Sequence, residues 1–185
     1  MHIDPKNPQY RYFMKGAHLD DADEISDLRF LVRKDLNFDA QCEKIASLAT
    51  RRVYALFRAL SSTDSATLLN AFKTYVRPIL ECGTVIFNPH RRKAVMLLEK
   101  VQSSFTRKLL MRTTGGFRYD QIPCSNTRNF NLGQSSLAER RGKFDLIMIH
   151  KILYGYTDLK QEVLFNTRES VTRGTSRKLL LKRAS

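Results

Sequence analysis

Tryptophan is absent from this sequence and cysteine is scarce, with three residues in 185. Cys42, Cys82 and Cys124 lie far apart, no Cys-x-x-Cys pair occurs, and the four histidines fall in no ligand spacing. These absences argue against a zinc site, so we expect no bound metal. Three isolated thiols in a chain without a recognisable signal peptide predict a reducing, intracellular environment.

Long apolar runs are missing as well. The longest, such as Leu146–Ile149 and Val95–Leu98, are far too short to cross a bilayer, which takes about 20 residues. We therefore expect no membrane among the partners of this chain. We also expect no small-molecule substrate.

Acidic residues are also few. The chain has 32 Lys and Arg against 18 Asp and Glu, a formal net charge of +14 and a pI near 10.0. Residues 1–38 hold 6 basic residues against 7 acidic ones, whereas residues 39–185 hold 26 against 11. A surface this basic attracts polyanions, and nucleic acid is the first candidate. An acidic protein partner or a merely solubilising charge is the alternative.

The hydrophobic pattern predicts a mainly α fold, with a small N-terminal β-hairpin, a three-helix bundle and a further C-terminal helix. Hydrophobic residues make up 42% of the chain, enough for one modest core. In the N-terminal part we expect a hairpin that turns at Lys15-Gly16 and then a strand over Leu28–Val32. The expected organisation is a lead-in and hairpin (1–38), a helical bundle (39–115), an irregular linker (116–135), a helix (136–156) and a mobile basic tail (157–185).

Apolar residues at spacings of three and four predict the bundle helices between Asp39 and Arg112. We expect Asp39 to cap the first helix, and Pro78 to kink the second because proline lacks a backbone donor. The three apolar stripes are Ile45–Leu60, Leu68–Leu80 and Leu97–Leu109.

A capping box of Ser136 and Glu139 opens the last helix, which we expect to run from Ser136 to Tyr154. Its inward face is expected to hold Phe144, Ile147, Met148, Ile152 and Leu153.

Basic residues recur opposite the apolar stripes. Lys44, Arg51 and Arg58 are spaced by seven, so they line one side of a helix. An ordinary charged surface is the alternative, but Arg51 and Arg58 have no acidic partner four residues away, which favours a polyanion contact. The expected nucleic-acid-binding residues are Lys44, Arg51, Arg58, Lys73, Arg77, Arg91, Arg92, Lys93, Lys100 and Arg107.

The third bundle helix opens with His90-Arg91-Arg92-Lys93, and positive charge at a helix start is unfavourable to the macrodipole. A function other than helix stability is therefore favoured for this cluster. Farther along, Lys100 and Arg107 share a face with Ser103 and Ser104, where a phosphate backbone can approach closely.

Three runs in this order carry a resemblance: LLNAFKTYVRPILECGTVIFNPH, LLEKVQSSFTRKLL and LAERRGKFDLIMIHKILYG. They resemble the segment after the polymerase palm in LINE-type (non-LTR) retrotransposon reverse transcriptases. Phe72, Cys82 and Phe87 replace the aromatics usual there, and Phe30 stands where the family has a glycine. The matching residues are Lys73, Thr74, Val76, Arg77, Pro78, Leu80, Glu81, Gly83, Pro89, Leu97, Leu98, Glu99, Lys100, Val101, Gln102, Thr106, Arg107, Leu137, Glu139, Arg140, Arg141, Asp145, Leu146, Lys151, Ile152, Leu153 and Gly155.

The resemblance covers about residues 10–180 and implies the C-terminal part of an RNA-directed DNA polymerase: the last palm strands, the thumb and a helical extension. It implies binding of an RNA/DNA template–primer duplex by its backbone, within a nuclear or cytoplasmic ribonucleoprotein. The missing palm and fingers of the parent polymerase are the other implied partner.

The family enzyme uses Mg²⁺, but its catalytic palm is not in this chain. Asp20 and Asp21 lie in LDDADE, without the aromatic of the family's Y/F-x-D-D turn, and we interpret them as a solvated loop. We therefore expect no catalytic residues, no cofactor and no polymerisation by this chain alone. Two alternatives stay open. One is a retroelement-derived helical module that binds a protein through an apolar groove and has no nucleic-acid role. The other is activity in complex with a separate palm.

Overall fold

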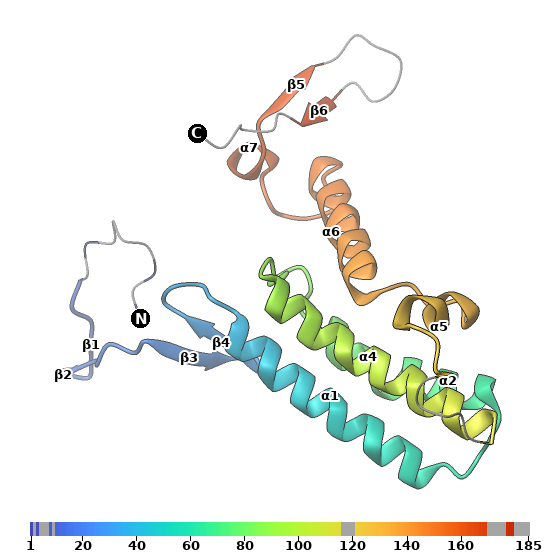
Figure 1. Cartoon of the computed structure of the whole chain (residues 1–185). Helices are drawn as coiled ribbons and strands as arrows, with labels where there is room; N and C mark the ends of the chain where they lie inside the picture. Colours follow the sequence, from blue (N-terminus) through green and yellow to red (C-terminus); the bar gives the residue numbers. More distant parts are fainter. Residues whose placement is uncertain (2, 4–7, 9, 116–120, 170–176, 180–185) are drawn as a thin grey trace. The chain divides into compact units, whose positions relative to one another are not determined.

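The computed structural model describes residues 1, 3, 8, 10–115, 121–169 and 177–179. The chain divides into two units, Met1–Arg141 and Gly142–Ser185. Helices dominate the described residues, which confirms the mainly α fold (Figure 1).

Two short antiparallel hairpins precede the helices. The first turns at Lys15 and Gly16, both at positive φ, as the sequence predicts. The second turns at Leu28 and Arg29, so our assignment of Leu28 to a strand was wrong; its side chain is 84% exposed. The strands are β1 (Phe13–Met14), β2 (Ala17–His18), β3 (Glu24–Asp27) and β4 (Phe30–Arg33).

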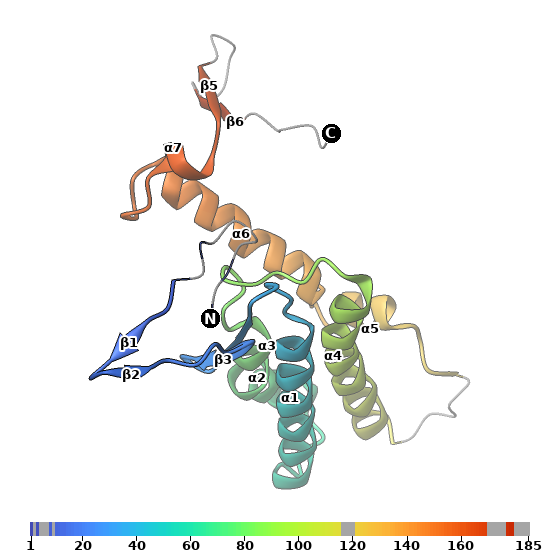
Figure 2. The same cartoon turned by 90° about the vertical axis from the view of Figure 1, so that its left-hand side faces the viewer.

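The bundle of the first unit has four helices, α1 (Asp39–Ala59), α2 (Ser65–Tyr75), α3 (Arg77–Glu81) and α4 (Arg92–Thr113). The two long helices, α1 and α4, lie side by side (Figure 1, Figure 2), and α2 contacts both. The predicted apolar stripes face one another in the core, where the Phe72 and Phe105 rings stack with centroids 4.1 Å apart. Each fully buried side chain of this size stabilises the fold by about 1.5–3 kcal/mol.

Polar side chains form hydrogen bonds with backbone groups at both ends of α1. Phe38 is the N-cap residue of α1 and Asp39 its first helical residue, so our assignment of the cap to Asp39 was wrong; the Asn37 Oδ1 atom accepts a hydrogen bond from the Asp39 N–H at 2.9 Å. At the other end, Arg112 of α4 donates to the carbonyls of Phe57 (2.7 Å) and Leu60, where α1 has no further turn whose N–H groups could donate to them.

Proline breaks the second predicted helix and does not merely kink it. Helix α2 ends at Tyr75, and α3 begins at Arg77 with Pro78 in its first turn. Proline is well placed there, because its missing N–H would have no partner in a first turn.

Strand β4 packs closely against the segment that follows α3. Gly83 has φ of 71°, and a Cβ atom there would overlap the Phe30 ring. Phe30 meets Phe87 edge-on at 6.0 Å between centroids, and Phe38 stacks on the same ring at 5.5 Å. Phe30 therefore occupies the space that Gly83 leaves open.

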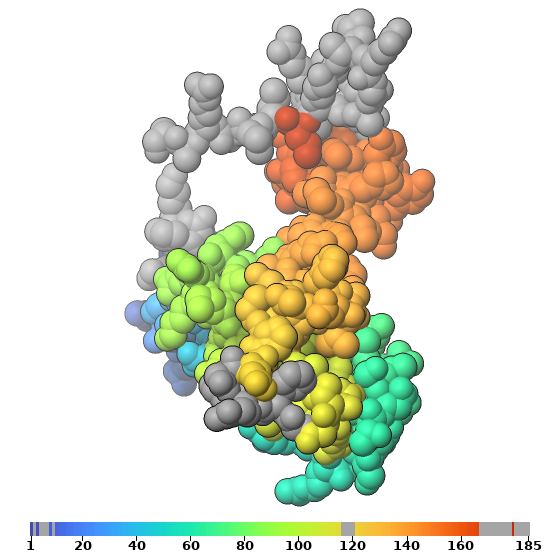
Figure 3. Space-filling view, turned by 45° about the vertical axis from the view of Figure 1, so that its right-hand side comes forward, coloured from blue at the N-terminus to red at the C-terminus, as the bar shows by residue number. Residues whose placement is uncertain are grey.

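A short helix, α5 (Ser125–Asn131), lies in the segment that we expected to be irregular. It contacts α4 (Figure 3). Arg128 fixes it there, with Nη2 2.9 Å from Ser103 Oγ and 3.1 Å from Ser103 O, and with Nε 3.2 Å from Thr106 Oγ1. Our assignment of residues 116–135 to an irregular linker was therefore wrong for Ser125–Asn131. Residues 116–120 lie outside the described part.

Helix α6 (Leu137–Leu153) confirms the predicted last helix, and the Ser136 hydroxyl accepts from the Glu139 N–H at 3.1 Å. In the second unit, Ile152 is buried, whereas Ile147 is 52% exposed and was wrongly placed on the inward face. This unit also contains α7 (Gln161–Leu164) and the hairpin of β5 (Thr167–Glu169) with β6 (Arg177–Leu179). Of the predicted mobile tail, residues 170–176 and 180–185 lie outside the description.

Candidate nucleic-acid interface

The side-by-side packing of α1 and α4 leaves a groove of about 510 Å³ along the first unit. We call it the α1–α4 groove. Its walls include small side chains, among them Ala46, Ser47, Thr50 and Ser104. Because none of these fills the space between the helices, an extended polyanion backbone can approach the helix surface closely there.

Cations border this groove on both sides. Arg51 of α1 and Lys100 of α4 both line it and are exposed. Lys44 and Arg58, one heptad before and after Arg51, are exposed on the same side of α1. The structure therefore brings Arg51 of the predicted α1 stripe and Lys100 to opposite sides of one groove, whose lining also includes Glu43.

Sequence reasoning missed Tyr54 and Lys108 at this surface. Tyr54 lines the groove and is 56% exposed, and the Lys108 ammonium lies 4.3 Å from the centroid of its ring. The available signal was spacing, since Tyr54 follows Arg51 by three residues and Lys108 follows Ser104 by four, which places each on the same side of its helix as a groove residue.

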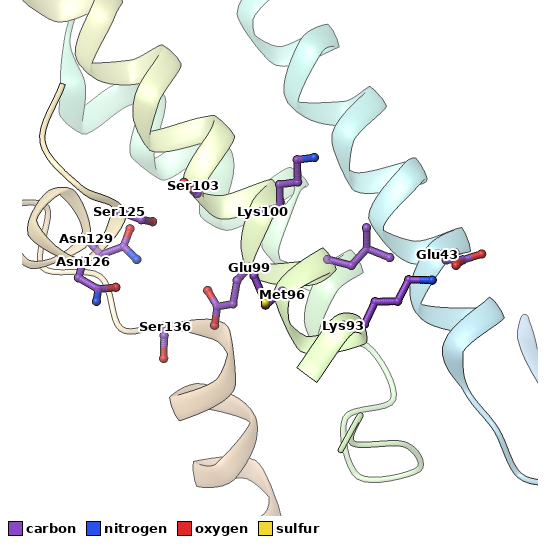
Figure 4. A pocket seen from close by; sticks show the side chains of 11 residues that line it. Glu43, Lys93, Met96, Glu99, Lys100, Ser103, Ser125, Asn126, Asn129 and Ser136 are labelled. Carbon is purple, nitrogen blue, oxygen red and sulfur yellow. The ribbon is translucent and has the colours of Figure 1, made fainter. Parts of the chain in front are cut away.

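The basic cluster at the start of α4 is exposed, but part of its charge is paired. Arg91 Nη1 lies 2.7 Å from Asp39 Oδ2 of α1. Lys93 extends toward Glu43 (Figure 4), while Arg92 is exposed at the first residue of the helix. This end of α4 therefore carries less net positive charge than its sequence indicates.

Of the predicted binding residues, Arg51 and Lys100 line the groove and the others do not. Lys73 is exposed, but on α2 and away from the groove lining. Arg77, which we placed on the exposed side, is half-buried; it donates to Gln134 Oε1 and lies 5.8 Å from the centroid of the Phe72 ring. Burial, together with the nearby Arg140, lowers the Arg77 pKa. Arg107 is half-buried beside α5, and its charge helps to lower the Arg128 pKa after the larger effect of burial.

Arginines from the last third of the first unit bind groups inside the protein. Arg140 forms a two-pronged ion pair with Glu81, whose hydrogen bond raises the Arg140 pKa; Nη2 to Oε2 is 3.0 Å. Arg141 is 2% exposed and donates to the carbonyls of Leu80 and Phe87, the latter at 3.4 Å. These groups attach the start of α6 to α3 and to the segment that follows it.

The acidic loop near the N-terminus does not fit a metal-dependent polymerase site. Asp20 and Asp21 are exposed, and Asp23 pairs with Lys34 Nζ at 2.5 Å, a contact that lowers the Asp23 pKa. Among the residues that the structure describes, no three His, Cys, Asp or Glu side chains are grouped so that they could hold a metal ion.

Comparisons with known proteins give one relative. No protein-family model matches the chain, and no solved structure matches it significantly. The chain is 26% identical over 133 residues to "Uncharacterized protein B0403.1" of Caenorhabditis elegans. The match covers 71% of this chain and 64% of that protein, so this chain spans less than two thirds of its relative. Within the described helices, none has the combined length and apolar character needed to cross a membrane.

Proposed function

We propose that this chain is the thumb-side part of a LINE-type reverse transcriptase and that it binds an RNA/DNA duplex through the phosphate backbone. The α1–α4 groove carries the proposal, because exposed cations stand on both of its sides and small side chains line it. Contacts of this kind position a duplex and read no sequence. On this proposal the protein acts within a nuclear or cytoplasmic ribonucleoprotein, bound to the palm and fingers of the parent polymerase.

A contact between distant segments supports the kinship. The resemblance rests partly on Leu80 and Glu81 and partly on Arg140 and Arg141, about sixty residues later. Glu81 binds Arg140, and the Leu80 carbonyl accepts from Arg141. Residues that match the family in separate runs thus hold one another in place in the folded chain.

The proposal predicts a steep salt dependence of binding. Each phosphate contact releases condensed counterions and contributes about 0.9 to the slope of log affinity against log salt. If about five cations reach phosphates, the slope is about −4 to −5. We expect the double substitution Arg51→Ala/Lys100→Ala to make this slope less steep by about 1–2 units and to weaken all duplex sequences alike. Fluorescence anisotropy with a labelled duplex over a salt series measures both.

The matched control is Arg52→Ala/Lys73→Ala. It removes one exposed arginine and one exposed lysine from the same unit, but neither residue lines the groove. Both double variants should keep the far-ultraviolet circular dichroism of the parent, because exposed substitutions usually cost under about 0.5 kcal/mol. Equal slopes for the two double variants would refute the groove as the binding surface.

Exposed apolar side chains favour a second candidate, a retroelement-derived module that binds a protein. Phe130 on α5 is 85% exposed, and Leu146 on α6 is 67% exposed. A partner bound through such side chains buries apolar surface and releases few counterions. Retention of a partner at high salt, combined with a duplex slope near zero, would favour this candidate over the first.

A further inference from the structure

We propose that a second cavity, beside α5, takes one unpaired nucleotide of the nucleic acid held in the α1–α4 groove. This inference rests on the proposed function and extends it from duplex binding to the recognition of a strand end. We call the cavity the α5 pocket. Its volume is about 830 Å³, and α4, α5 and the start of the Ser136 turn surround it (Figure 4).

The chemistry of the α5 pocket differs from that of the groove. Two amides, Asn126 and Asn129, stand on α5, and hydroxyls come from Ser103, Ser125 and Ser136. Amides and hydroxyls both donate and accept hydrogen bonds, so this wall suits a neutral ligand that carries donors and acceptors together. The edges of nucleobases have this character, and an asparagine amide can pair with such an edge through two hydrogen bonds.

The α4 side adds two apolar side chains, beside Lys93, Glu99 and Lys100 of the same helix. They are Met96 and Leu97. An unpaired base is commonly held by hydrogen bonds at its edge and by aromatic or apolar contacts on its face. Met96 is 59% exposed, and methionine adapts well to flat ligands because its side chain is flexible and polarizable.

One buried group in this wall is not satisfied. Asn129 is 7% exposed, and its Oδ1 atom accepts no hydrogen bond from any group that the structure describes. Such an atom costs free energy, and native proteins usually give it a partner. Because the Oδ1 atom is itself closed off from solvent, the Asn129 amide must turn toward the α5 pocket for a ligand to reach this atom. The site is also rigidly built, because Arg128, between the two amides in sequence, anchors α5 to Ser103 and Thr106 of α4.

The charges of the α5 pocket place the phosphate on the groove side. Glu99 accepts from the Ala138 N–H at 2.9 Å, and Lys93 extends toward Glu43 (Figure 4). Lys100 lines both the α5 pocket and the α1–α4 groove. A strand whose phosphate contacts Lys100 can therefore lie in the groove while its next base enters the pocket, which favours a strand end over a free nucleotide.

The test compares three short duplexes in the same anisotropy assay: blunt, with a short single-stranded overhang, and with an abasic overhang that has the same phosphates. We expect the overhang with bases to bind about tenfold more tightly than the abasic one, the usual effect of holding one base. Asn126→Ala and Asn126→Trp, which remove the exposed amide or fill the cavity, should abolish this ratio and leave blunt-duplex affinity unchanged. Asn131→Ala, exposed on the same helix but outside the α5 pocket, should leave the ratio intact.

Each outcome separates the two proposals. Blunt-duplex binding with equal affinity for the two overhangs overturns the pocket and leaves the proposed function standing. A base-dependent ratio that persists in both Asn126 variants also overturns the pocket. A protein that binds none of the duplexes overturns both proposals.

Discussion

The arginines and lysines that matter in the first unit fall into two groups. One group binds partners within the protein, and the other is exposed to solvent. In α3, α5 and the start of α6, four arginines are buried or half-buried and bind carbonyls, hydroxyls, an amide or Glu81: Arg77, Arg128, Arg140 and Arg141. Along α1 and across the groove, the predicted cations are exposed, and they comprise Lys44, Arg51, Arg58 and Lys100.

The difference shows that a net charge of +14 is not a measure of the charge available to a ligand. Burying an unpaired guanidinium costs free energy. Each of these buried arginines accordingly has hydrogen-bonding partners within the protein. Its charge then stabilises the protein. The exposed cations remain hydrated and can exchange counterions for phosphates. Substitutions in the two regions should therefore affect different measurements.

The largest expected effect is on stability, from Arg141→Met. Methionine keeps an aliphatic chain over the Phe87 ring, from which the guanidinium carbon is 5.4 Å distant, but leaves the Leu80 and Phe87 carbonyls without this donor. We expect the free energy of unfolding to fall by about 2–4 kcal/mol. Urea unfolding followed by circular dichroism measures it.

Arg51→Met is the control, since it makes the same change at an exposed position, where we expect less than about 0.5 kcal/mol. Similar losses for the two variants would mean that the buried and exposed arginines do not differ in the way the structure indicates.

Periodicity predicted most of the fold and only part of the site, and the reason lies in the arginines. The stripes from Ile45 to Leu109 fixed the helices because apolar side chains must share a face to be buried. Helix α5 was missed because its inward residues are Arg128 and Asn129, which a hydrophobicity pattern counts as outward. Arg77 was assigned to the surface for the same reason. A sequence does not show which charged residue has a distant carbonyl or carboxylate partner.

The Arg77→Ala variant tests whether Arg77 binds phosphate, as its spacing predicts, or stabilises the fold, as its contacts indicate. From its spacing, Arg77 was a phosphate contact, whereas in the fold it binds Gln134 and lies against Phe72. We expect a loss of about 1–2 kcal/mol in the free energy of unfolding and an unchanged salt slope for duplex binding. Arg51→Ala should do the opposite, with little change in stability and a slope that is less steep by about 0.9.

Lys73→Ala, one turn earlier and exposed, is the matched control and should change neither quantity. If Arg77→Ala reduced the slope as much as Arg51→Ala does, the distinction between the two regions would fail at this residue.

The smallest expected effect comes from Asp39→Asn, at the point where an exposed cation is paired. Asp39 Oδ2 lies 2.7 Å from Arg91 Nη1, and the Arg91 side chain is 70% exposed. An exposed ion pair contributes about 0–1 kcal/mol, so removing the carboxylate changes stability little and releases Arg91 for a phosphate. We expect duplex affinity to rise by at most about fivefold, and the slope to become steeper by at most about 0.9.

Arg91→Ala in the parent chain is informative about the same ion pair. If Asp39 neutralises Arg91, Arg91→Ala leaves the salt slope of the parent chain nearly unchanged. In the Asp39→Asn background, the same substitution should abolish the increase in duplex affinity and in slope that Asp39→Asn causes. A slope that is less steep in the single Arg91→Ala variant would show that Arg91 contacts phosphate despite its partner. An Asp39→Asn variant with the parental slope would instead place the start of α4 outside the bound duplex, and the interface would then be limited to the α1–α4 groove, with the α1 cations on one side and Lys100 on the other.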